Sequence, residues 1–238
     1  MKPPFPDRES TFDAFARHVL DHYLASSGIE ADVYPVQAAS GAGKPGVDEL
    51  REQVAALAGK DIYLQKPMTI HLAESLAVKD HSVKENLAKL ETGARRLAES
   101  LASDHKVLIF GNGGSAADAQ HIAAEFVNRF GIERPPLAAI ALTTDTSILT
   151  SIGNDYSFDQ IFEKQIQALG KRDDVAWGFS TSGNSPNVVA GLRAAREQGL
   201  RCLGMTGQGG ALIDASDLAL TVPTATTARV QETHIVMG

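Results

Sequence analysis

Short runs of hydrophobic residues alternate with helical patterns from residue 106 onwards. The apolar runs occupy residues 106–110, 137–142, 175–179, 201–205 and 218–221. The helical patterns between them occupy residues 115–130, 146–153, 158–169, 186–198 and 210–215. This alternation predicts a parallel sheet that is covered by helices on both faces. We therefore predict a doubly wound α/β fold, in which ligands bind at the carboxyl ends of the strands.

A long helical pattern over residues 71–103 precedes the first predicted strand. Apolar residues recur in it at near-helical spacing, at Leu72, Leu76, Val83, Leu87, Leu90, Leu97 and Leu101. The polar stretch 80–82 predicts an interruption of this helix. We therefore divide the chain into an N-terminal extension over residues 1–67 and an α/β domain over residues 68–238.

The extension over residues 1–67 resembles no family that we recognise. Its pattern at 12–24 predicts an amphipathic helix that carries His18 and His22 on one face. That pair could bind a metal, although an ordinary surface helix also accounts for the pattern. Lys44 follows a glycine-containing stretch but lacks the spacing and the Ser or Thr of a phosphate loop. An upstream start and a genuine accessory segment both remain open explanations of the extension.

Composition narrows the class of protein. Apolar residues make up 43% of the 238 residues, which is ample for a buried core. The net charge of -7 argues against nucleic acid and anionic membranes as partners, and favours a small ligand. Cys202 is the only cysteine, which excludes an intrachain disulfide and a cysteine-based zinc cluster. With no apolar stretch of membrane-spanning length, we expect a cytoplasmic protein.

A glycine-rich turn follows the first predicted strand. It consists of Gly111, Asn112, Gly113, Gly114 and Ser115, and it opens the helical pattern at 115–130. Glycine lets a backbone approach a ligand closely, and the N-terminus of a helix attracts anions. The turn therefore predicts an anion-binding loop.

A second polar loop follows the strand predicted at 175–179. It carries the hydroxyls of Ser180, Thr181, Ser182 and Ser185, which could surround a phosphate together with backbone N–H groups. A capping turn is the alternative, because serine, threonine and asparagine are common N-caps. Since both loops fall at the same edge of the predicted sheet, we favour phosphate binding.

His121 and Glu125 lie on one face of the helix that begins at the first loop. By spacing alone they are typical of an exposed ion pair. Their place near the ligand edge adds two alternatives, because both side chains bind zinc and a carboxylate can act as a general base. Asp118 shares this face, but acidic residues also favour helix N-termini. Gln231 and His234 share a face of the last helical pattern, where a polar helix start is the alternative.

These motifs together resemble the phosphoheptose isomerases of the sugar isomerase (SIS) domain superfamily. The resemblance runs from about residue 68 to residue 238, in the family's order and spacing. Its motifs are Gly-Asn-Gly-Gly-Ser at 111–115, Asp-Ala-Gln-His at 118–121 with Glu125, the segment 139–145, Gly-Asn-Asp at 153–155, Ser-Thr-Ser-Gly-Asn-Ser at 180–185 and Gln-Glu-Thr-His at 231–234. It implies conversion of sedoheptulose 7-phosphate to D-glycero-D-manno-heptose 7-phosphate through an enediol. This reaction supplies heptose for lipopolysaccharide and other surface glycans.

The resemblance also implies roles for individual residues. Glu125 would be the catalytic base, and His121, Glu125 and Gln231 fall on the metal positions of zinc-containing members. The substrate contacts fall on Asn112, Gly113, Gly114, Ser115, Arg129, Asp145, Ser180, Thr181, Ser182, Ser185 and Gln231. The family further implies a phosphorylated seven-carbon sugar as ligand, and a homotetramer with sites where subunits meet.

One position departs from the family pattern. The family places a histidine, its general acid and a further metal ligand, eight residues after Gln231, whereas the sequence ends at Gly238. We therefore expect weakened catalysis from a chain that lacks it. His234 is the nearest substitute, but it lies roughly 140° away around the helix.

Two non-enzymatic readings are the alternatives: the DnaA-binding initiator-associating proteins, and the phosphosugar-sensing domains of transcription regulators. Glu125 favours the enzyme, because the DnaA-binding relatives tend to lack this carboxylate. Residues 1–67 show no basic helix-turn-helix pattern, which disfavours a regulator.

Overall fold

The sheet lies at the centre of the computed structural model, which describes residues 68–238. The extension, with its predicted helix, Lys44 and the histidine pair, lies outside the described residues. Within the described part, five parallel strands pair in the order β2-β1-β3-β4-β5. They are β1 Val107–Gly111, β2 Ala139–Ala141, β3 Val175–Ser180, β4 Arg201–Thr206 and β5 Leu218–Thr221. The predicted strands are therefore confirmed, with β2 shorter than its apolar run.

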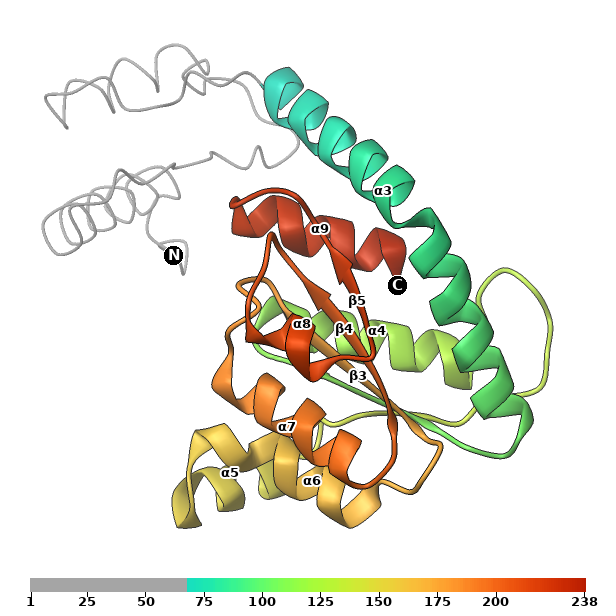
Figure 1. The fold of residues 1–238 in the computed structure, drawn as a ribbon, viewed down its shortest axis with the longest axis vertical. Coiled ribbons are helices and arrows are strands. Elements are labelled where there is room, and N and C mark those ends of the chain that lie inside the picture. The colour runs from blue at the N-terminus through green and yellow to red at the C-terminus, as the bar shows by residue number, and fades with distance from the viewer. Residues whose placement is uncertain (1–67) are drawn as a thin grey trace, which may run out of the picture. The chain divides into compact units, whose positions relative to one another are not determined.

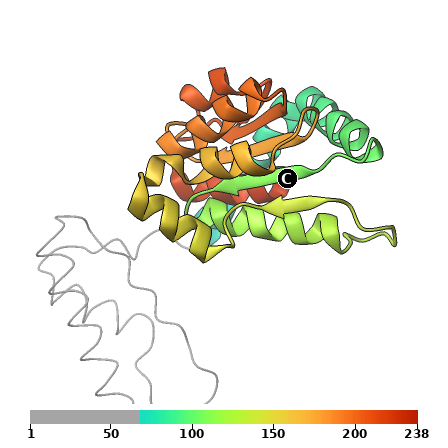
Figure 2. The same cartoon turned by 90° about the horizontal axis from the view of Figure 1, so that it is seen from below.

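Helices cover both faces of this sheet (Figures 1 and 2). One face packs against α3 Met68–Ala102, α4 Gly114–Val127 and α9 Thr227–Met237. The other packs against α5 Thr146–Asp155, α6 Ile161–Leu169, α7 Pro186–Glu197 and α8 Ala211–Ala215, with a 3-10 turn at Phe158–Gln160 before α6. This arrangement confirms the doubly wound α/β fold.

The strands are buried on both faces because their side chains alternate in direction. In β1, Leu108 and Phe110 join the core under α6 and α7, whereas Val107 and Ile109 join the core under α4. All four side chains are fully buried. A strand that is covered on both sides must be continuously apolar, which is why the sequence shows runs rather than an alternating pattern.

Helix α3 is continuous, so the interruption predicted at residues 80–82 is wrong. The amide of Asn86 donates to the Ser82 carbonyl at 2.8 Å and to the Thr221 carbonyl at 2.9 Å. Its oxygen accepts the Thr221 N–H at 3.2 Å. Asn86 is almost fully buried, and this contact fixes α3 along the outer edge of β5. Tertiary bonding thus overrides the weak helix preference of the polar stretch.

Helix α4 ends at Val127, earlier than its pattern predicted. The guanidinium of Arg134 donates to the carbonyls of Glu125 at 2.7 Å and Phe126 at 2.8 Å. These bonds satisfy carbonyls that have no partner inside the helix, and they stop it there. Arg129 therefore lies beyond the helix end.

No helix within residues 68–238 is both long and apolar enough to cross a membrane.

Candidate active site

The two polar loops open at the point where the strand order reverses. The chain passes from β1 to β2 on one side, and then to β3 on the other side of β1. Gly111 at the end of β1 pairs in register with Phe179 of β3, so both loops leave the sheet at one level. Ligands bind at such a switch point in open parallel sheets. The structure thus brings together the two loops that the sequence singled out.

The first loop presents the N-terminus of α4. Gly113, its N-cap, has a φ of +56°, a left-handed conformation that favours glycine. Among the described residues, no side chain caps this end of α4. Ser115 is buried at the first turn, and its N–H donates to the Asn112 carbonyl at 3.0 Å. An uncapped N-terminus offers its remaining N–H groups to an anion.

The second loop gathers three hydroxyls. The Oγ of Ser180 lies 2.8 Å from that of Ser185 and 3.4 Å from that of Ser182. Ser185 is the N-cap of α7, yet within the described part of the chain its side chain makes no capping bond. Because the hydroxyls face one another and leave the helix end open, this geometry favours the phosphate cradle over the capping turn. Thr181 lies between them, partly exposed.

A glycine locks the second loop against the loop that follows β4. Gly183 has a φ of +70°, and a Cβ there would lie 1.9 Å from the Gly209 carbonyl oxygen. The Thr206 hydroxyl donates to that same carbonyl at 2.8 Å. Neither the turn nor the packing tolerates a side chain at Gly183, so the hydroxyls before and after it are held in place.

Gln231 lies over the first loop. A Cβ added to Gly114 would lie 1.8 Å from the Gln231 Nε2. Helix α9 therefore packs its first turns against the start of α4, and glycine at 114 makes room for the amide. Gln231 belongs to the loop rather than to the far part of α4.

His121 and Glu125 form a pair farther along α4. The His121 Nε2 and Glu125 Oε1 are 3.3 Å apart, and the side chains are 61% and 37% exposed. His121 follows Gly114 by seven residues, or about 10 Å along the helix axis. The structure therefore brings two of the three predicted metal residues together, and the third, Gln231, lies over the start of the same helix. Within residues 68–238, no group of three His, Cys, Asp or Glu side chains could hold a metal.

Asp118 lies on α4 between Gly114 and His121, and its side chain is buried. It follows the first turn of α4, so attraction to the helix N-terminus does not explain it. Burial raises the pKa of Asp118, and the nearby His121 partly opposes this. Its Oδ2 has no hydrogen-bond partner among the described residues. The sequence pattern did not indicate that this carboxyl group would be buried without a partner for one of its oxygens.

Two predicted substrate residues have other partners in the structure. The carboxylate of Asp145 caps α5 by accepting the Ile148 N–H at 2.9 Å. Arg129 is exposed and forms an ion pair with Glu133. Their contacts with the sugar stay predictions.

Asn112, the other predicted sugar contact, bonds through its side chain to Asn187. Each amide donates to the other, at 2.8 and 2.9 Å. Asn187 was missed because an asparagine beside Pro186, at the start of a helix, is typical of a cap. Nothing in the local pattern indicates a partner 75 residues away.

His234 is fully buried, which removes it as a substitute acid. Its ring meets the Phe179 ring edge-on, with the centroids 5.9 Å apart. Neither ring nitrogen has a hydrogen-bond partner in the part of the chain that the structure describes. Burial lowers the pKa of His234 to about 4. A neutral, enclosed imidazole cannot exchange protons with a sugar at the loops.

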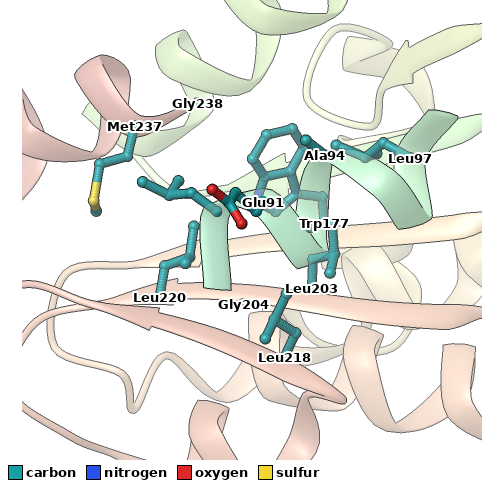
Figure 3. A pocket seen from close by; sticks show the side chains of 12 residues that line it. Glu91, Ala94, Leu97, Trp177, Leu203, Gly204, Leu218, Leu220, Met237 and Gly238 are labelled. Carbon is teal, nitrogen blue, oxygen red and sulfur yellow. The ribbon is translucent and has the colours of Figure 1, made fainter. Parts of the chain in front are cut away.

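A separate apolar cavity of about 370 Å³ lies between α3 and the sheet (Figure 3). Its walls include Leu90 and Leu97 of α3, Trp177 of β3 and Met237 of α9. Glu91 is the only charged residue among its described lining residues. Such walls do not suit a phosphate, so the polar loops remain the candidate site.

Comparison with known proteins is consistent with this site. The chain matches the SIS domain family over residues 71–207. Phosphoheptose isomerase from Nitratidesulfovibrio vulgaris (strain Hildenborough) is 59% identical over 169 residues, covering 71% of this chain and 81% of that protein. The Geobacter sulfurreducens phosphoheptose isomerase is 53% identical over 171 residues, covering 71% and 90%.

Two solved structures agree with these sequences. Phosphoheptose isomerase from Neisseria gonorrhoeae has a TM-score of 0.66 at 44% identity, covering 79% of this chain and 94% of that one. The enzyme from Francisella tularensis has a TM-score of 0.69 at 36% identity, covering 71% and 91%. The matches confirm the family that the motifs indicated.

The buried His234 predicts acid sensitivity. The unfolded chain takes up this proton near pH 6.5, but the folded chain only near pH 4. Between these values the unfolded state binds more protons, so the free energy of unfolding falls as the pH falls, by about 1.4 kcal/mol per unit. Above pH 6.5 this contribution is fully present. Urea unfolding between pH 7.5 and pH 4.5 should show a shallower pH dependence for His234→Gln than for the wild type.

The exposed His81 supplies the control for this prediction. The His81→Gln variant should keep the wild-type pH dependence of unfolding. If the free energy of unfolding changes with pH equally in the wild type and in His234→Gln, the buried imidazole does not cause the acid sensitivity.

Proposed function

Because the chain belongs to the phosphoheptose isomerases of the SIS domain family, we propose that it interconverts sedoheptulose 7-phosphate and D-glycero-D-manno-heptose 7-phosphate. The observation that carries this proposal is the meeting of two uncapped helix N-termini and three serine hydroxyls at the switch point. A carboxylate, Glu125, lies on one of those helices. A phosphate site and a potential base are what a phosphosugar isomerase requires.

The loops would hold the phosphate without a cationic side chain. Ser180, Ser182 and Ser185 converge as donors, and Ser115 with Thr181 adds hydroxyls at the same edge. The N-termini of α4 and α7 add backbone N–H groups and the positive ends of their dipoles. These interactions would fix the phosphate end of the sugar.

Glu125 would then move the proton. Exchange of a ketose and an aldose requires removal of a proton from the carbon beside the carbonyl, and its return to the neighbouring carbon. A single carboxylate can do both, since the two carbons are adjacent. Glu125 is partly exposed on α4 and lies close to His121, so its carboxylate is open to solvent. This retained carboxylate also favours an enzyme over the DnaA-binding and sensor alternatives.

Replacement of Glu125 tests the proposed reaction. Glu125→Gln keeps the shape of the side chain but removes the base, so kcat should fall at least about 100-fold. Affinity for sedoheptulose 7-phosphate, measured by calorimetry, should change little. Turnover is followed by NMR of the sugar phosphates.

Glu197→Gln, an exposed carboxylate at the end of α7, is the matched control and should keep full activity. An active Glu125→Gln enzyme would refute the base assignment. A wild-type chain that binds the sugar without converting it would support the binding-protein alternative.

We also propose a zinc ion at His121 and Glu125. An imidazole nitrogen and a carboxylate oxygen 3.3 Å apart, both open to solvent, can bind one ion. These two residues supply only part of a site, and Gln231, over the start of the same helix, is the third predicted ligand. When bound, zinc supplies Lewis-acid stabilisation of sugar oxygens. His121 and Glu125 would hold the ion, and the Glu125 carboxylate would serve both as a ligand and as the base.

Zinc binding can be measured without activity. Equilibrium dialysis followed by elemental analysis should find zinc on the wild type and at least about ten-fold weaker binding to His121→Gln. The His81→Gln variant should bind zinc as the wild type does. Equal zinc binding by the wild type and His121→Gln would contradict the proposed zinc site.

We further propose that the chain works in the cytoplasm as a homotetramer, as the family resemblance implied. Leu76 and Leu87 share one face of α3, and Phe130 and Ile132 follow α4; all four side chains are more than half exposed. Burial of these groups between copies would stabilise an assembly. A neighbouring chain could also bring Gln231 to the pair on α4.

Light scattering after gel filtration tests this assembly. The mass should be about four times the 25.3 kDa of one chain. A Leu76→Glu, Leu87→Glu double variant should give smaller species, because it places charges on the apolar face. A wild-type mass of one chain at micromolar concentration would contradict the tetramer.

A further inference from the structure

We infer that Asn187 is a positioning residue, which sets the orientation of the Asn112 side chain at the sugar site. The inference rests on the proposed function, in which Asn112 touches the sugar. The two side chains form a closed amide pair, with Asn112 Nδ2 to Asn187 Oδ1 at 2.8 Å and Asn187 Nδ2 to Asn112 Oδ1 at 2.9 Å. The pair joins the loop after β1 to the start of α7.

Asn187 is the rigid member of the pair. Its side chain is 1% exposed, and it follows Pro186 in the first turn of α7. Its Oδ1 also accepts the Val188 N–H at 2.9 Å. Rotating the amide by half a turn would place an NH2 group against that N–H, so only one orientation is satisfied. The backbone of α7 therefore fixes the orientation of the Asn187 amide.

That orientation is passed on to Asn112. Since Asn187 presents its oxygen and its NH2 group in fixed places, Asn112 must present the complementary groups. Asn112 stands between Gly111 and Gly113, which give it no neighbouring side chains for support. The pair uses one N–H and one oxygen lone pair of Asn112, and leaves the others for a ligand. A polar contact made this way is oriented before the sugar arrives.

A purely structural clamp is the competing explanation of the same pair. A clamp would act through the stability of the fold, so its loss would lower activity only as far as it lowers the free energy of unfolding. A positioning residue acts through Asn112, so its loss lowers activity beyond any loss of stability and has no further effect once the Asn112 amide is gone. The coupling shows that the two residues act together, and a control variant of similar stability separates the two explanations.

The experiment is a double-mutant cycle on kcat/KM for sedoheptulose 7-phosphate. Asn187→Leu removes the pair at similar volume. Asn187→Asp keeps the Val188 bond but turns an oxygen towards the Asn112 oxygen. Each should lower kcat/KM at least about ten-fold. With Asn112→Ala already present, Asn187→Leu should change kcat/KM by less than about two-fold.

Asn86→Leu is the matched control. Asn86 is another buried asparagine whose amide bonds to backbone, but it lies at the edge of β5. This variant should unfold at lower urea concentration and keep its kcat/KM. Should Asn187→Leu be too unstable to purify, Asn187→Asp carries the cycle alone, since it retains the bond to α7.

Two results would overturn the inference. One is wild-type kcat/KM in both Asn187 variants, and the other is a loss that multiplies with that of Asn112→Ala. The same cycle run on calorimetric affinity needs no turnover, so a chain that binds the sugar without isomerising it contradicts the proposed function while still testing Asn187. A chain that does not bind the sugar overturns both.

Discussion

The parallel pairing of β1 with β3 is the constraint on which the site depends. The two strands are neighbours in the sheet although β2 lies between them in the chain, and their register brings Gly111 level with Phe179. The helices that follow them, α4 and α7, therefore both start at this edge, on opposite faces of the sheet. The positive ends of their dipoles lie at the same edge, and no local feature of either loop could achieve this alone. A shift of register would separate the serine hydroxyls from the glycine turn.

The proposed anion site contains no cluster of lysine or arginine, although the chain is acidic. The net charge is -7, yet the loops offer hydroxyls and helix ends that carry only partial charge. The helix N-termini differ in whether a side chain of the N-cap residue bonds to them. The side chain of Asp145 caps α5, whereas the N-cap residues of α4 and α7, Gly113 and Ser185, make no side-chain capping bond. An uncapped helix gives up some stability and keeps its N–H groups for a ligand.

The sequence predicted the strands and both loops because those features are local. Buried parallel strands require apolar runs, and close backbone approach requires glycine at positions such as 113 and 183. The features that the sequence did not predict depend on contacts with residues far away in the chain. The continuity of α3 rests on the bonds between Asn86 and Thr221, and α4 ends at bonds from Arg134 to its last carbonyls. Likewise, spacing could not show that Gln231 stands over Gly114, because that depends on how α9 crosses α4.

The hydrogen bonds between α3 and the edge strand β5 also limit how chains can associate. A sheet grows when a foreign strand bonds to a free edge, and Asn86 and Lys89 already occupy backbone groups of Thr221 and Ala219 along β5. The opposite edge is β2, whose three residues give an added strand little to hold. The sheet is therefore guarded against edge-to-edge aggregation on both sides. Contacts between copies are left to the helical surfaces, which can change without disturbing the strands.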